Sequence, residues 1–152
     1  MARLERNVDT ELISIVERAA EFHGHLGPFL VIGVRIGLIG LRESGIENND
    51  GNLRITAMLM DSIPFSCTID GIQVATKCTL GNRKLKLIDS SGIAAEFELQ
   101  HGGKVTVAVN PVTFNRLKRK LLSKNVSPED TRKLAWMVAS MPEEELFIIR
   151  SK

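Results

Sequence analysis

The chain has 152 residues, of which 43% are hydrophobic and 25% are charged. This composition is that of an ordinary globular protein and excludes a disordered or collagen-like chain, and the length favours a single domain over residues 1–152. The net charge is only +2, and two cysteines are too few for a disulfide scaffold, so with no secretory signal in view we expect a protein of the reducing cytoplasm.

Two helices and a glycine-rich turn are predicted first. Asp9 or Thr10 is a suitable N-cap, and apolar residues then follow at helical spacing as far as His23. A segment with two glycines and a proline ends this helix. Pro28 suits the first position of a second helix, which runs to about Ser44.

The second helix carries Gly33, Gly37 and Gly40, and each costs about 1 kcal/mol relative to alanine in a helix interior. Three such residues predict close approach by another backbone, either a core strand or a partner subunit. The apolar run 29–41 is shorter than the roughly 20 residues that a membrane span needs and contains Arg35, so no membrane helix is predicted.

The middle of the chain reads as strands around one short helix. A turn at 49–52 precedes a strand over Leu53–Met60, and a short helix follows over Ile69–Thr76. Three further strands, separated by glycine-containing turns, predict an antiparallel meander: Leu85–Ile88, Ala94–Leu99 and Val105–Val109.

Helices return at the end of the chain. A basic helix is predicted over Thr113–Lys124, and a second helix begins after the Ser127-Pro128 cap. Pro142 opens a final short turn or helix, which an extended segment follows over Phe147–Ile149. This order predicts an α+β fold with helices packed on one mixed, mostly antiparallel sheet.

Charge is unevenly distributed along the chain. Residues 77–124 carry ten basic and three acidic side chains, which gives +7, whereas residues 1–76 carry six basic and ten acidic side chains, which gives −4. The basic part could attract a small anionic ligand or an acidic subunit, or could simply be a solvated helix face. No aromatic platform accompanies it, which argues against nucleic acid as a partner.

His23 and His25 are the first candidates for chemistry. Neutral imidazole is a good ligand for zinc, nickel or iron, and Gly24 between the two histidines provides the bend that would let both face one ion. The alternative is that both residues only cap the turn between the two helices.

The two cysteines flank the short middle helix. Cys67 precedes it, where the helix dipole would lower the thiol pKa and favour a metal ligand or a nucleophile; an inert buried thiol is the alternative. Cys78 lies past the other end, roughly 16 Å away if the span is helical, which is too far for a disulfide. Asn82, Arg83 and Lys84 follow in a polar loop suited to an anion, without the spacing of a phosphate-binding P-loop. His101 is expected to be exposed in a hairpin turn.

Three segments together resemble a known family. FHGHLGPFLVIGVRIG, SCTIDGIQVATKCTLG and PEEELF are similar to the FmdE component of formylmethanofuran dehydrogenase and its stand-alone relatives. The resemblance implies an α+β fold related to the catalytic domain of glyceraldehyde-3-phosphate dehydrogenase, and a metal site at His23, His25 and Cys67. The chain departs from the family in having Gly27 where a cysteine is usual, and in lacking the cysteine-rich C-terminal zinc module.

This resemblance implies a metal-binding accessory protein of one-carbon, methanofuran-linked metabolism, with zinc preferred over nickel or iron. Cys78 and the loop 82–84 would hold a small anionic ligand beside the metal. One alternative is a metal-free assembly subunit that uses helix 28–44 to form a homodimer or to dock on a larger complex. Another is a thiol enzyme with Cys67 as nucleophile and His23 or His25 as base. Nothing in the sequence could carry the redox chemistry of formylmethanofuran dehydrogenase alone, so the resemblance implies an oxidoreductase-associated subunit with no self-sufficient catalytic centre.

Overall fold

The computed structural model describes residues 9–46, 53–100, 102–123 and 125–152. The expected turn at 49–52 and His101 lie outside these residues. The described helices and strands alternate in the order α–α–β–α–β–β–β–α–α–α–β, which confirms the predicted α+β class. Their bounds are α2 (Thr10–His23), α3 (Pro28–Ser44), β1 (Arg54–Leu59), α4 (Cys67–Thr76), β2 (Leu85–Asp89), β3 (Ala94–Glu98), β4 (Lys104–Val109), α5 (Pro111–Leu121), α6 (Pro128–Ser140), α7 (Glu143–Leu146) and β5 (Phe147–Ser151).

The first two helices have the predicted bounds because their capping residues act locally. The Asp9 side chain accepts a hydrogen bond from the Glu11 amide and caps α2. Gly24 ends this helix in the left-handed conformation, with φ +94°, where a side chain would be strained. Pro28 opens α3 and Gly45 closes it in the same left-handed way. The turn that carries the two histidines is therefore fixed by glycine and proline.

The five strands form one mixed sheet in the order β2-β1-β3-β4-β5. β1 and β2 are parallel, and the other three pairs are antiparallel. The predicted meander is therefore wrong at its first strand, because β2 pairs with β1 and not with β3. The reason is that α4 forms the crossover between β1 and β2, and a crossover returns the chain parallel to the strand it left. The exposed Lys86 and Asp89 also suit β2 to the edge of the sheet.

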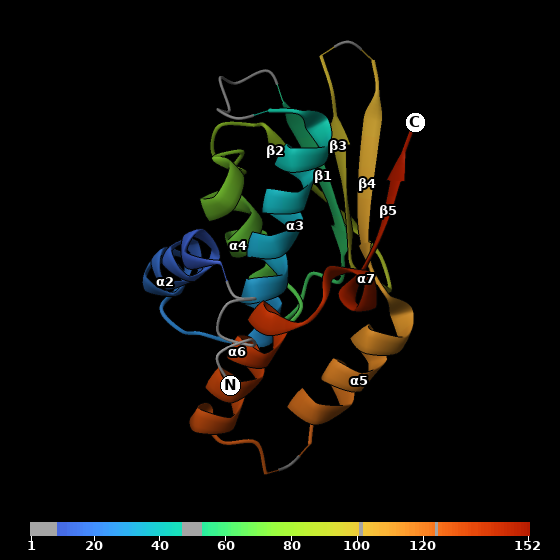
Figure 1. Cartoon of the computed structure of the whole chain (residues 1–152). Coiled ribbons are helices and arrows are strands. Elements are labelled where there is room, and N and C mark those ends of the chain that lie inside the picture. The colour runs from blue at the N-terminus through green and yellow to red at the C-terminus, as the bar shows by residue number, and fades with distance from the viewer. Residues whose placement is uncertain (1–8, 47–52, 101, 124) are drawn as a thin grey trace.

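The helices α2, α3 and α4 gather on one face of the sheet, while α5, α6 and α7 lie beyond the end of the strands (Figure 1). Three phenylalanine rings join these parts: Phe29 of α3 and Phe114 of α5 each lie within 6.0 Å, centroid to centroid, of Phe65 just before α4. Within the described residues, no helix is long and apolar enough to cross a membrane.

The glycines of α3 allow the close approach that the sequence predicted, and the approaching backbone belongs to α4. A Cβ atom on Gly33 would lie 2.1 Å from the Thr68 carbonyl oxygen, and one on Gly71 would lie 2.2 Å from the Leu30 carbonyl oxygen. Gly40 makes room for the Phe97 ring of the sheet. These glycines therefore serve packing inside the chain and are not available as a dimer surface.

Candidate metal centre

The centre forms where the last turn of α2 meets the first turn of α4. α4 packs on both α2 and α3, and the glycine contact between α3 and α4 sets the position of its first turn. The helix begins at Cys67, two residues earlier than predicted, so this cysteine belongs to the first turn. Asp70 follows three residues later and therefore lies on the same face of the helix. His23 in the last turn of α2 reaches both side chains.

His23 joins Cys67 and Asp70 through its two ring nitrogens. Nδ1 lies 2.6 Å from Asp70 Oδ2, and Nε2 lies 3.2 Å from Cys67 Sγ. A carboxylate oxygen accepts hydrogen bonds, so Nδ1 carries the proton and donates it to Asp70. Nε2 is then the nitrogen with the lone pair, and it faces the thiol. The three side chains thus form a cysteine–histidine–carboxylate arrangement in which Asp70 fixes the imidazole tautomer.

The pKa of Cys67 is shifted opposite to the sequence-based prediction. Burial of the thiol, which is only 8% exposed, raises the pKa, and the negative charge of Asp70 raises it further. The expectation that the helix N-terminus would lower this pKa is wrong, because loss of solvent outweighs the helix dipole. Cys67 is thus a protonated thiol at neutral pH, and its S–H donates to His23 Nε2.

His25 lies near this group without joining it. Its side chain is exposed, and its ring centroid is 5.9 Å from that of His23. His25 and Cys67 both line a cavity of about 360 Å³, whose other walls are mainly apolar. In the ranges that the structure describes, no three His, Cys, Asp or Glu side chains stand together as a ready metal site. The structure therefore brings His23 and Cys67 together, while His25 shares a cavity with Cys67.

Gly27 lies at the wall of the same cavity. A Cβ atom there would be 3.2 Å from His25 Cε1 and 3.3 Å from the Thr131 methyl carbon. A cysteine at this position, which is usual in the family that the sequence resembles, would thus start beside the His25 ring. Gly27 and Thr131 leave this side of the cavity without a sulfur ligand.

Cys78 and the loop after it occupy other places. Cys78 follows the far end of α4, is fully buried, and has its sulfur 3.7 Å from the Leu53 carbonyl oxygen. The Asn82 side chain shapes its own loop, because its Oδ1 accepts from the Thr79 and Lys84 amides and its Nδ2 donates to the Lys77 carbonyl oxygen. Arg83 is exposed in the left-handed region, with φ +66°. Cys78 and this loop thus follow the opposite end of α4 from Cys67.

A chain of hydrogen bonds nevertheless links this loop to the centre. Asp70 Oδ1 accepts from Gln73 Nε2 at 3.1 Å, and Gln73 Oε1 accepts from the Leu80 amide at 2.9 Å. Sequence reasoning missed the parts of Asp70 and Gln73. The signal was present, because the i, i+3 spacing of Cys67, Asp70 and Gln73 places all three along one face of a helix.

The residues of this centre fall within a region shared with a known family. The family described as "FmdE, Molybdenum formylmethanofuran dehydrogenase operon" matches residues 22–148. The chain belongs to the FmdE family. The matched region begins one residue before His23 and includes Cys67 and Asp70, so the whole centre lies within the FmdE domain.

Two individual proteins are similar to this FmdE chain. A protein of Archaeoglobus fulgidus named "Probable S-adenosyl-L-methionine-binding protein" is 32% identical, and the match covers 93% of this chain and 43% of that protein. The chain thus spans less than half the length of this curated relative. A tungsten formylmethanofuran dehydrogenase FmdE-like protein of Syntrophus aciditrophicus has the same fold, with a TM-score of 0.58, 19% identity, and coverage of 93% of this chain and 71% of that one.

Proposed function

We propose that this FmdE chain binds a divalent transition metal, zinc in the first place, through Cys67 and His23, with His25 as the third ligand. The observation that carries the proposal is the orientation of His23: Asp70 holds its Nδ1 proton, so the Nε2 lone pair faces the Cys67 sulfur 3.2 Å away. Metal-binding histidines commonly donate their second ring nitrogen to a carboxylate in this way, which fixes the ring and raises its basicity.

The distance between the two donor atoms fits a small tetrahedral ion. Zinc bonds of about 2.3 Å to sulfur and 2.0 Å to nitrogen separate the two ligand atoms by about 3.5 Å at a tetrahedral angle. The observed separation of 3.2 Å requires a widening of only about 0.3 Å. Side-chain rotation at Cys67 or His23 supplies that much without movement of α2 or α4.

His25 completes the proposed ligand set by turning toward the cavity that it already lines with Cys67. Its side chain is exposed, so the metal bond has to offset the rotamer freedom that His25 loses on binding. Because Gly27 contributes no side chain, the fourth position remains for water or a ligand atom. Three protein ligands and one open position are typical of a catalytic or ligand-binding zinc site.

We extend the proposal to the role of an accessory protein in one-carbon metabolism linked to methanofuran, on the support of FmdE membership. The bound metal supplies a Lewis-acidic position for an anionic ligand atom. Asp70 orients the ligand His23 by a hydrogen bond, and Gln73 in turn donates a hydrogen bond that holds Asp70.

Metal analysis of untagged protein tests the proposal. We expect about one zinc per chain, a loss of metal in His23→Ala and Cys67→Ser, and a lower melting temperature after chelation. Cys78→Ala is the matched control, because it removes the other buried thiol and should keep the metal. Absence of stoichiometric metal, together with a melting temperature that a chelator leaves unchanged, would reject the proposal.

A second candidate function uses the same three side chains without a metal. Cysteine, histidine and carboxylate in hydrogen-bonded sequence are also the arrangement of thiol nucleophiles, with His23 as base. The raised pKa of Cys67 disfavours the thiolate that a metal-free nucleophile needs, whereas a bound metal would itself displace the thiol proton, so the metal site is the better-supported candidate. Alkylation with iodoacetamide at neutral pH separates the two: a nucleophile requires Cys67 to react fast and His23→Ala to slow it, and alkylation that spares Cys67 counts against it.

A further inference from the structure

α6 has a second face that the fold does not cover. Ala135, Val138 and Ala139 are buried on the side that packs against α3. Leu134 and Met137 lie on a different side, at the spacing of one helix turn, and Met137 is 37% exposed. α5 runs near this side but diverges from α6 (Figure 1). A helix of this fold would ordinarily bury such apolar side chains against a neighbour.

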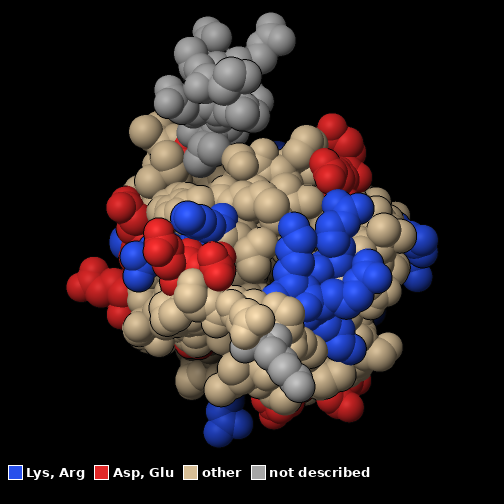
Figure 2. Space-filling model, turned by 90° about the horizontal axis from the view of Figure 1, so that it is seen from below, with Lys and Arg blue, Asp and Glu red and all other residues tan. Residues whose placement is uncertain are grey.

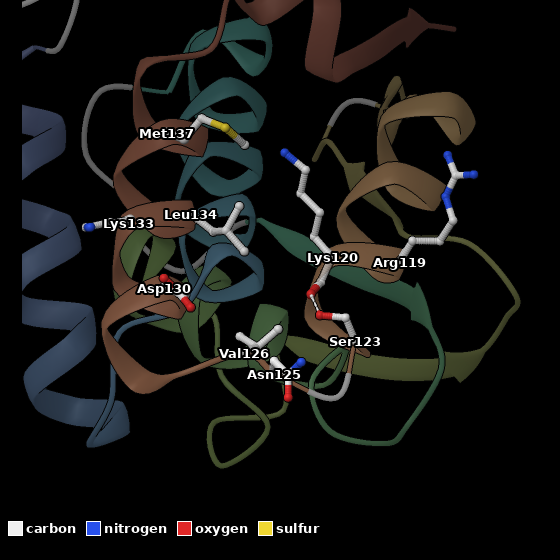
Figure 3. Close-up of a pocket in the computed structure, with 9 residues that line it drawn as sticks. All are labelled: Arg119, Lys120, Ser123, Asn125, Val126, Asp130, Lys133, Leu134 and Met137. Atoms are coloured by element: carbon white, nitrogen blue, oxygen red, sulfur yellow. Dashed lines mark hydrogen bonds between the residues drawn. The ribbon is translucent and has the colours of Figure 1, made fainter.

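A groove of about 600 Å³ lies between α5 and α6. Val126, Leu134 and Met137 form its apolar floor, and Leu134 and Met137 point into the space between the helices (Figure 3). Lys120 extends from α5 into the same space, where its carbonyl oxygen also accepts the Ser123 hydroxyl at 3.0 Å. The groove is thus apolar at its base and cationic along its α5 edge.

The cations continue beyond the groove. α5 contains four basic residues and no acid, and Lys and Arg side chains gather in one patch over this part of the molecule (Figure 2). Arg116 lies 3.8 Å from Glu145, whereas Arg119 and Lys120 form no ion pair among the described residues. On the α6 side, Lys133 lies at the rim of the groove, points away from the space between the helices (Figure 3) and pairs loosely with Glu129 at 3.7 Å.

The acid of the groove is already engaged in the structure. Asp130 accepts a hydrogen bond from the Ser127 amide and so completes the capping box of α6. Its charge is directed to the helix N-terminus, where a carboxylate is stabilised. The charge that the groove itself presents to an occupant is therefore that of Lys120, with the other cations of α5 beyond its rim.

We propose that the groove between α5 and α6 is the docking site for an acidic amphipathic helix of a partner protein. An occupant has to cover the apolar floor and also offer negative charge to Lys120, which points into the groove, and to the basic surface of α5 beside it (Figure 3). A small inorganic anion would satisfy the cations and leave the floor exposed. No aromatic side chain lines the groove, so the bases of a nucleic acid would find nothing there to stack on.

The geometry favours a helix as the occupant. Asp130, Lys133, Leu134 and Met137 form a ridge at positions i, i+3, i+4 and i+7 of α6. A helix laid along this ridge would place its own apolar residues, repeated every three or four positions, over Leu134 and Met137. Its acids on the α5 side would then meet Lys120 and the neighbouring cations of α5. The groove shares α5 and α6 with the cavity of the metal centre, which Leu121, Leu122 and Thr131 line, but none of the side chains that line the groove belongs to the proposed ligand set.

The test uses a synthetic acidic peptide of about 16 residues, with leucine at every third or fourth position and glutamate on both flanks. Fluorescence anisotropy should show saturable binding to the full chain at low salt. Lys120→Glu and Met137→Asp should each weaken binding by about tenfold or more. Lys86→Glu makes the same charge reversal on the edge strand β2, away from the groove, and should change binding by less than about twofold. Circular dichroism confirms that each variant is folded.

Three results would overturn the proposal. The first is equal weakening by Lys120→Glu and Lys86→Glu, which would show attraction by net charge alone. The second is equal binding of a peptide with the same composition in shuffled order, or equal competition by polyglutamate, because neither has an apolar face. The third is the absence of saturable binding by the designed peptide.

Discussion

Replacement of Gly33 by alanine tests the contact on which the position of the metal centre depends. A Cβ atom at Gly33 lies 2.1 Å from the Thr68 carbonyl oxygen and 3.0 Å from the Gly71 Cα. Both are backbone atoms, so no side chain can rotate away. Non-bonded heavy atoms settle at about 3.5 Å, and α4 must therefore retreat by more than about 1 Å.

Two opposing terms decide the sign of the effect. Alanine is favoured over glycine in a helix interior by about 1 kcal/mol. Overpacking a close contact costs about 1–3 kcal/mol, and a rigid backbone contact lies at the upper end. We expect a net loss of about 1–2 kcal/mol in the free energy of unfolding, which lowers the urea midpoint by about 0.5–1 M. Gly92→Ala is the control, because a Cβ atom there has nothing within 4 Å.

Urea denaturation followed by circular dichroism measures both variants. Because Thr68 is next to Cys67 in the first turn of α4, Gly33→Ala should also weaken metal binding, whereas Gly92→Ala should not. A Gly33→Ala protein more stable than wild type, by the roughly 1 kcal/mol of helix propensity, would refute the reasoning. It would mean that α3 and α4 are not in backbone contact.

Three further predictions concern single side chains. Asp70→Asn removes the carboxylate that orients His23 and should weaken zinc binding by about ten- to hundredfold in a chelator competition, with the melting temperature of the metal-free chain little changed. Glu143 bonds to Arg42 at 2.7 Å, and this hydrogen bond holds the pKa of Glu143 below its usual range. The Arg42–Glu143 pair therefore adds to the free energy of unfolding above the ordinary glutamate pKa, and this contribution is lost as pH falls through the lowered pKa of Glu143 in the folded chain. Glu143→Gln should cost at most about 1 kcal/mol at pH 7 and nothing in strong acid. Arg35 donates from the buried side of α3 to carbonyl oxygens at the end of α6, and Arg35→Met should cost about 2–3 kcal/mol in urea denaturation by leaving them unpaired.

The parts of the fold that the sequence predicted correctly depend on neighbours along the chain. Asp9, Gly24, Pro28 and Gly45 act within one turn of the helix ends they set, so the bounds of α2 and α3 could be deduced. The pairing of β2 could not be deduced, because its five residues do not indicate that β1 lies between it and β3. Strand order is decided by packing across the whole sheet.

The same division holds for the centre. The sequence indicated His23 and Cys67 as neighbours only through the family resemblance, and the structure places their side chains in contact. The direction of the Cys67 pKa shift was predicted wrongly because it depends on burial, which the local helix position does not reveal. The basic segment 77–124 was visible in the sequence, but the grouping of its α5 cations beside an apolar groove depends on where α6 packs.

The central claim is that Cys67 and His23 together bind one metal ion. Titration of cobalt(II) into the metal-free chain tests it most directly, because a thiolate bound to cobalt gives a near-ultraviolet charge-transfer absorption and the protonated thiol must release a proton on binding. We predict one equivalent of cobalt per chain, with this absorption in wild type and Cys78→Ala and without it in Cys67→Ser. An absorption that persists in Cys67→Ser, or no stoichiometric binding in wild type, would contradict the account.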